Sequence, residues 1–247
     1  MERLPPSRIK LALLKLGLGP VLLAQGRRAR ARTPRLPEPA GLRAGCAGSG
    51  PPLRLLLVGD SSGAGVGVAS QEQALLGQLL EGLTPHFAVT YRLVAKNGLT
   101  TEQLARRLDD EMAEEFDVAI TAVGVNDVTA GLDEPTCIGH HRQLHELLRN
   151  KFSVAHILVT GLPPVHAFPA LPQPLRFYLG GVALHHDFRL EAAVAKDENV
   201  HYIGLRDFSA DTVMASDGFH PSAQIYRIWA AKLCQRIRQI HASRLSG

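Results

Sequence analysis

The chain has 247 residues, of which 45% are hydrophobic and 20% are charged, a balance typical of a soluble globular protein with one sizeable core. Residues 1–52 carry ten lysines and arginines but two acidic residues, whereas residues 53–247 hold 17 basic and 21 acidic residues. The globular part is therefore mildly acidic, which argues against a nucleic-acid-binding face, and we expect no nucleic acid partner.

Residues 9–24 are apolar but interrupted by Lys10, Lys15 and Pro20. This run is shorter than the roughly 20 apolar residues that span a bilayer, and the arginine-rich residues 26–32 follow it directly. The pattern favours a segment lying at a membrane surface, so we expect peripheral membrane contact through residues 9–32 and a cytoplasmic, membrane-associated protein. A frayed tail, or an uncleaved export signal that directs the protein to the periplasm, remain alternatives.

Residues 33–52 contain five prolines and four glycines, which disfavour helices and strand ladders. We interpret this stretch as a linker. The prediction is an N-terminal arm and linker over residues 1–52, followed by a single folded domain over residues 53–247.

Short apolar runs alternate with segments of helical period from Leu53 onward. The runs predict strands at residues 53–58, 87–95, 117–123, 154–160 and 200–204, and the longer segments predict helices at 71–83, 101–115, 134–149, 181–196 and 221–240. Such alternation predicts an α/β fold: a three-layer α/β/α sandwich around a five-stranded parallel sheet of flavodoxin-like order. Ligands of such folds bind beyond the carboxyl ends of the strands.

The first predicted strand runs into a glycine-rich turn, "GDSSGAGVG", at residues 59–67. A P-loop would need a lysine after its glycines, and a dinucleotide loop would need GxGxxG opening a helix at once. Here the glycines follow a GxGxG spacing, and Asp60 would repel phosphate. The turn therefore does not predict nucleotide binding.

The alternative is that this turn presents a nucleophile. A serine hydroxyl needs a general base, for which His220 is suited, and Asp217 is placed one turn earlier to orient the imidazole. Backbone N–H groups of Ser61 and Gly98 and the side-chain amide of Asn126 lie at neighbouring strand ends, where they would stabilise an oxyanion.

These residues together resemble the SGNH/GDSL hydrolase superfamily of serine esterases and lipases. "VGDSSGAGVG" resembles its first block, "NGLTT" its second, "GVND" its third, and "SDGFHPS" its DxxHP block. The resemblance implies a flavodoxin-like sandwich, a catalytic triad of Ser61, Asp217 and His220, and an oxyanion hole of Ser61, Gly98 and Asn126. It also implies neither metal nor cofactor. Ser62 departs from the family, many members of which have leucine there.

Other polar residues have structural interpretations. We expect Asp60, Ser62 and Asp127 to fix turns through hydrogen bonds. His141 and His145 have the i, i+4 spacing of some zinc sites, as part of a run with His140, but no HExxH motif is present and we expect a solvated helix face. The three cysteines are far apart and predict neither a disulfide framework nor a zinc site.

The long apolar connection at residues 161–180 is either a packed loop or a wall over the acyl pocket, with Val165, Phe168 and Phe177 as tentative substrate-binding residues. We therefore expect a serine carboxylic-ester hydrolase that acts on short to medium acyl or lipid-like esters. A lysophospholipase, thioesterase or acyltransferase of the same fold, or a non-catalytic membrane-associated adaptor, are the alternatives.

Overall fold

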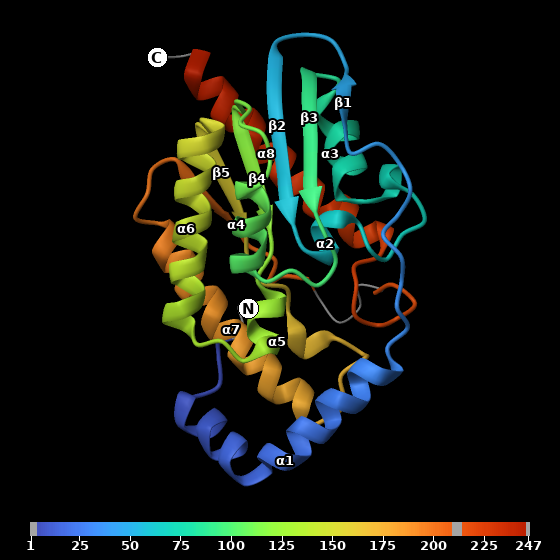
Figure 1. The fold of residues 1–247 in the computed structure, drawn as a ribbon, viewed down its shortest axis with the longest axis vertical. Coiled ribbons are helices and arrows are strands. Elements are labelled where there is room, and N and C mark those ends of the chain that lie inside the picture. Colours follow the sequence, from blue (N-terminus) through green and yellow to red (C-terminus); the bar gives the residue numbers. More distant parts are fainter. Residues whose placement is uncertain (1–3, 209–213, 246–247) are drawn as a thin grey trace.

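The structure is a computed structural model that describes residues 4–208 and 214–245. It places a central sheet between two layers of helices (Figure 1). The strands are β1 (Ala44–Ala47), β2 (Pro52–Gly59), β3 (Ala88–Ala95), β4 (Val118–Ala122), β5 (His156–Thr160) and β6 (Val200–Ile203). The longer helices are α1 (Arg8–Arg32), α3 (Leu75–Leu83), α4 (Thr101–Asp109), α6 (Glu134–Phe152), α7 (Leu175–Val194) and α8 (Ala223–Leu245). Shorter turns of helix are α2 (Ser61–Ala64), α5 (Val125–Ala130), η1 (Gln71–Gln73) and η2 (Val165–Ala167).

The strand order is β1-β3-β2-β4-β5-β6, and all neighbours from β3 to β6 pair in parallel. The predicted α/β sandwich and its flavodoxin-like parallel order are confirmed. The prediction of five strands is wrong, because β1 pairs antiparallel with β3 and adds a sixth strand at the edge. β1 lies within residues 33–52, where its glycine content concealed it.

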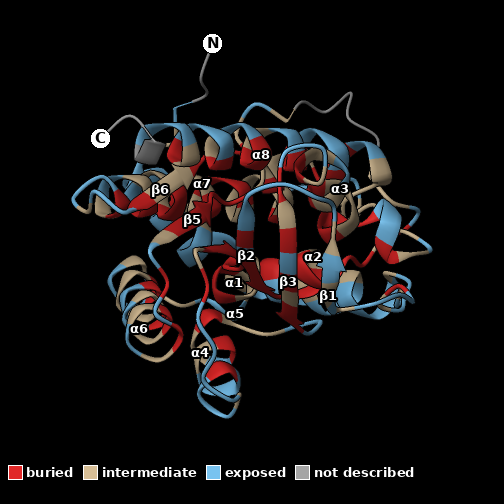
Figure 2. Cartoon of the chain, turned by 90° about the horizontal axis from the view of Figure 1, so that it is seen from above, coloured by how far each residue is buried: buried red, intermediate tan, exposed pale blue. Residues whose placement is uncertain are grey.

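The core lies on both faces of the sheet, as expected for parallel strands whose two faces are covered. Alternate residues of β2 divide between the faces: Leu55 and Leu57 pack under α3 and α8, whereas Leu56 and Val58 pack under α4, α6 and α7. Figure 2 shows the buried residues concentrated between these layers. This arrangement holds the carboxyl ends of β2 to β6 at one end of the molecule.

Two predicted helix boundaries are wrong for identifiable reasons. α4 ends at Asp109 rather than at residue 115, because Glu111 and Glu114 leave the helix to pair with Arg92 at 2.6 and 2.9 Å. α7 begins at Leu175 rather than at residue 181. Gly180, the last residue of the predicted connection, lies inside α7, where a Cβ atom would come within 2.5 Å of His166, so close packing requires glycine there.

Candidate active site

The turn after β2 presents Ser61 at the carboxyl end of the sheet. Gly59 ends the strand against the β4 backbone, where a Cβ atom would lie 2.4 Å from the carbonyl oxygen of Ala122. Asp60 then caps the start of the short helix α2, which begins at Ser61 and ends at Ala64, and Gly65 caps its end in the left-handed conformation. Glycine is favoured at such a position because other residues are strained there. The local sequence thus fixes Ser61 at a tight strand-to-helix turn.

Asp60 and Ser62 stabilise this turn, as predicted. One carboxylate oxygen of Asp60 accepts hydrogen bonds from the Ser62 N–H at 3.0 Å and from the Ser62 hydroxyl at 2.8 Å. Burial raises the pKa of Asp60 to about 6, although the bonds from Ser62 and the nearby His220 act to lower it. The Ser62 hydroxyl is committed to Asp60, which leaves Ser61 as the available nucleophile.

Asp217 and His220 form the predicted pair. The His220 Nδ1 atom lies 2.5 Å from Asp217 Oδ2, and the backbone N–H groups of Phe219 and His220 donate to Asp217 Oδ1 at 2.9 and 3.0 Å. Burial acts to raise the pKa of Asp217, but these hydrogen bonds hold it below the ordinary value. The carboxylate therefore stays ionised, keeps the proton of His220 on Nδ1 and leaves Nε2 able to accept a proton.

Gly67 brings the serine turn and the histidine loop together. A Cβ atom on Gly67 would lie 2.2 Å from the carbonyl oxygen of Pro221 and 3.3 Å from Cβ of His220. Ser61 and His220 consequently line one cavity. No hydrogen bond joins the Ser61 hydroxyl to the His220 imidazole in the described part of the chain.

The predicted oxyanion donors surround the same turn. The Ser61 N–H, at the first position of α2, and the Gly98 N–H donate to no acceptor within residues 4–208 and 214–245. Gly98 adopts φ +86°, with open space where a Cβ atom would point. The Asn126 amide lines the cavity and donates to the Leu99 carbonyl at 2.9 Å and more weakly to Asp60 at 3.3 Å. An oxyanion would compete with the longer of these two bonds.

The wall of the cavity is mainly apolar, and of the three predicted pocket residues only Phe168 lines it. Val165 is buried beside it in an apolar cluster that includes Leu162 and Phe168. Phe177 lies on α7, away from the cavity, with the Lys10 ammonium 5.1 Å from its ring. Sequence reasoning missed the other large apolar lining residues, which are Leu162, Leu205, Phe208, Met214, Phe219, Ile225 and Trp229.

Comparison with known proteins shows the family of the chain. Residues 57–228 match the GDSL-like lipase/acylhydrolase family. The chain belongs to this family. A GDSL-like esterase of Mycobacterium tuberculosis is 27% identical over an alignment 211 residues long, which covers 78% of this chain. The chain spans 64% of the length of that relative.

Solved GDSL-like structures share the fold. A lipolytic G-D-S-L protein from Veillonella parvula superposes with a TM-score of 0.58 at 16% identity, covering 74% of this chain and 96% of its own. A carbohydrate acetylesterase family member from Sinorhizobium meliloti gives a TM-score of 0.56 at 18% identity, covering 76% and 98%.

Several residues that support this GDSL-like site were missed or undervalued from sequence. Glu38, in the predicted linker, accepts the Asn97 N–H at 2.7 Å, beside Gly98, and pairs with Arg43 at 2.8 Å. Nothing in the sequence signals this contact, because residue 38 lies far from the motif blocks. On the other side of the site, Asp187 accepts the Leu162 N–H at 2.7 Å and holds the cavity wall.

Asp127, in the GVND block, has the structural role that we predicted. Its buried carboxylate accepts the N–H and hydroxyl of Thr101 at 3.0 and 3.1 Å, which ties the start of α4 to α5. Burial raises its pKa, although the bonds from Thr101 act to lower it. Asp127 thereby fixes the loop between Gly98 and α4.

The histidines of α6 are not the solvated face that we expected. His141 is buried, its Nδ1 atom lacks a hydrogen-bond partner, and burial lowers its pKa to about 3. His145 is largely enclosed beside it, and burial lowers its pKa to about 4. Within the described residues, no group of three or more histidine, cysteine or acidic side chains is placed to hold a metal ion.

Proposed function

We propose that this chain is a serine carboxylic-ester hydrolase that acts through an acyl-enzyme on Ser61. One observation carries the proposal: Ser61 and His220 line the same apolar cavity, and His220 is oriented by Asp217 at 2.5 Å. Membership of the lipase/acylhydrolase family supports the same chemistry.

In the proposed reaction, the Ser61 hydroxyl attacks the ester carbonyl carbon while Nε2 of His220 takes its proton. The carbonyl oxygen becomes an oxyanion that accepts from the N–H groups of Ser61 and Gly98 and from Asn126. The C–O bond to the alcohol then breaks, and His220 returns the proton to the leaving oxygen. A water molecule, deprotonated by His220, attacks the acyl-enzyme and releases the acid and free Ser61.

The cavity supports esters with an apolar acyl group. Phe168, Phe219 and Trp229 are among its lining residues, and the acidic and basic side chains among the described residues of its wall are Asp60 and His220. Apolar surface of this kind binds hydrocarbon chains in rough proportion to the area that is buried. We therefore propose short to medium acyl or lipid-like esters as the substrate class.

The test is hydrolysis of p-nitrophenyl esters from acetate to dodecanoate. We expect Ser61→Ala to abolish turnover and covalent labelling by a fluorophosphonate, because the nucleophile is removed. Ser62→Ala is the matched control and should still label at residue 61. Turnover that survives in Ser61→Ala would refute Ser61 as the nucleophile. A wild-type protein that neither labels nor hydrolyses the esters would refute the proposal and favour a non-catalytic adaptor.

A further inference from the structure

Helix α1 has two apolar faces, of which the domain covers one. Leu11 and Leu22 on the inner face are buried, and Leu22 belongs to an apolar cluster with Leu162 and Phe168 of the cavity wall. The outer face carries large apolar residues at the i, i+4, i+7, i+11 and i+14 spacing of one helical stripe. We call this stripe the outer stripe of α1: Ile9, Leu13, Leu16, Pro20 and Leu23.

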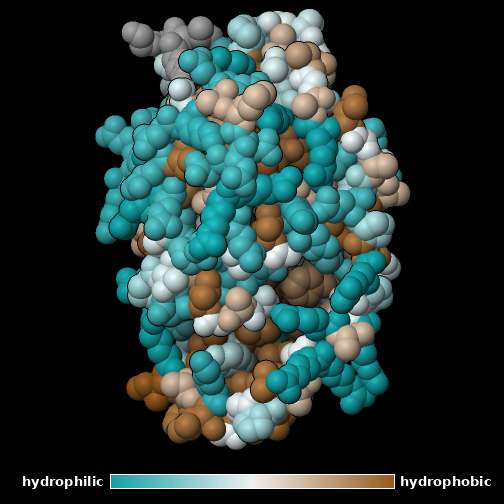
Figure 3. Space-filling model, in the orientation of Figure 1, coloured by the Kyte–Doolittle hydropathy of each residue, from teal (hydrophilic) through white to brown (hydrophobic). Residues whose placement is uncertain are grey.

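The outer stripe faces solvent along its length. Ile9 is 74% exposed, Leu16 is 84% exposed and Leu23 is 57% exposed. Figure 3 shows hydrophobic side chains along the lower edge of the molecule, over this helix. Scattered exposed apolar residues are ordinary on protein surfaces, but a continuous row of them marks an interaction surface.

The same side of the helix continues into positive charge. Arg27 and Arg30 follow the outer stripe at helical spacing, Arg28 and Arg32 lie on other faces of the same last turns, and α1 itself contains no acidic residue. These four arginines form no ion pair with any acidic side chain that the structure describes. An apolar row that ends in unpaired arginines is complementary to a bilayer with acyl chains below anionic headgroups.

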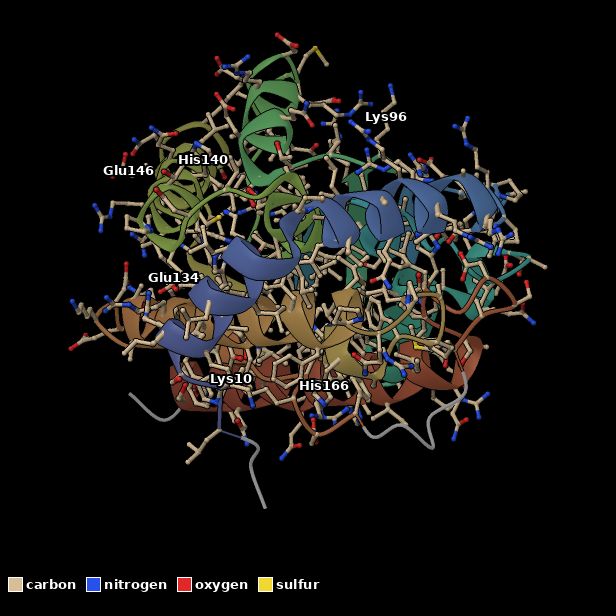
Figure 4. All side chains as sticks on the ribbon, turned by 90° about the horizontal axis from the view of Figure 1, so that it is seen from below. Lys10, Lys96, Glu134, His140, Glu146 and His166 are labelled. Carbon is tan, nitrogen blue, oxygen red and sulfur yellow. The ribbon has the colours of Figure 1, made fainter. Side chains whose placement is uncertain are left out.

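Helix α1 lies on the active-site side of the molecule. Figure 4, viewed from below Figure 1, shows it crossing the end of the sheet toward which β2 and β3 point, with Lys10 near its start. Polar contacts fix its position: Gln25 donates to the Gln173 carbonyl at 2.7 Å and accepts the Leu175 N–H at 3.1 Å, and Arg8 pairs with Glu134 at 2.6 Å.

We propose that the outer stripe and the arginines of α1 bind the surface of an anionic lipid bilayer, with the helix parallel to the membrane plane. By length and composition α1 could also cross a bilayer. A transmembrane orientation would require it to leave α7 and break the Gln25 and Arg8 contacts, whereas the parallel orientation keeps them. This proposal does not depend on the esterase reaction, since binding requires no turnover.

The test is co-sedimentation of the full-length protein with vesicles of phosphatidylcholine alone, or of phosphatidylcholine mixed with phosphatidylglycerol. We expect binding to the anionic vesicles and much weaker binding to the neutral ones. Leu13→Asp with Leu16→Asp should abolish binding, and Arg27→Gln with Arg30→Gln should weaken binding to anionic vesicles by about tenfold or more. Met112→Asp, at an 80% exposed site outside α1, is the matched control and should bind like the wild type.

Equal binding by the wild type and the Leu13→Asp, Leu16→Asp protein, or no binding to either vesicle, would overturn the proposal. So would a wild-type dimer that the Leu16→Asp change dissociates, because a second copy would then cover the stripe. Binding that resists both high salt and alkaline washing would instead indicate a spanning helix. Circular dichroism confirms that each exposed-site variant is folded.

Discussion

The side chains of Asp217 and His220 have different tasks, and their substitution should cost different amounts. Asp217→Asn keeps the shape of the side chain but loses the charge that stabilises the imidazolium, so kcat should fall by about a thousandfold to ten-thousandfold. His220→Ala removes the proposed base itself and should cost about tenfold more than that. Steady-state kinetics on one p-nitrophenyl ester measures both.

The order of these two losses is the informative result. If Asp217→Asn were the more damaging change, the carboxylate rather than the imidazole would be the group that moves protons. Thermal unfolding of each variant is the control, because Asp217 also accepts two backbone N–H groups and its loss could loosen the loop.

The structure brings together the residues that the ordered motifs predicted. Ser61, Asp217, His220 and Asn126 lie around one cavity, because Ser61 and Asn126 belong to short helices that follow β2 and β4 and the other two precede α8 at the same edge of the sheet. Residues that line the cavity without belonging to a motif are harder to predict from sequence. The apolar character of Phe177 favours a substrate-binding role. In the structure α1 packs on α7, and Phe177 contacts Lys10 instead of the cavity.

Among the elements, the segment before β2 has more structure than a linker. Its strand β1 pairs with β3, and Glu38 holds the Asn97 N–H next to Gly98. The proline and glycine content indicates only that the segment has little tendency to form a helix or a strand by itself. The contacts that order it come from residues about 50 positions later, which local sequence patterns do not report.

Glu38→Ala should therefore impair catalysis more than folding. Without its acceptor, the Asn97 N–H no longer holds the loop, so we expect kcat to fall by about tenfold through a less ordered oxyanion hole. The melting temperature should change little, because partly exposed ion pairs contribute at most about 1 kcal/mol. Glu102→Ala, which removes the surface pair with Arg106, is the control and should leave kcat unchanged. An unchanged kcat in Glu38→Ala would show that the loop orders itself.

For the whole molecule, the buried histidines of α6 make stability dependent on pH. The pKa values of His141 and His145 are lowered to about 3 and about 4 by burial, so the folded chain binds fewer protons than the unfolded chain below about pH 6.5. The contribution of these neutral histidines to the free energy of unfolding is fully present above that pH and is lost as the pH falls toward 3. Asp60, with its pKa raised to about 6, has the opposite effect, because the folded chain then binds more protons than the unfolded chain near this carboxyl's pKa. Its pKa shift is smaller than those of the two histidines.

We expect the melting temperature to fall progressively between pH 6.5 and pH 4, and His141→Leu to flatten this slope. The exposed His86 provides the control, since His86→Leu should keep the wild-type slope. Calorimetry over this range gives the measurement. If the melting temperature of His141→Leu depended on pH as steeply as that of the wild type, groups other than His141 would cause the acid sensitivity.

The close approach of Gly67 to His220 and Pro221 joins the beginning of the domain to its end. The turn that holds Ser61 needs only β2 and its neighbours, but His220 arrives with the last loop before α8. A growing chain on the ribosome therefore carries Ser61 long before the proposed base is in place beside it. Reactivity at Ser61 should consequently be among the last properties to return on refolding, later than helix content, and fluorophosphonate labelling can serve as a measure of complete folding.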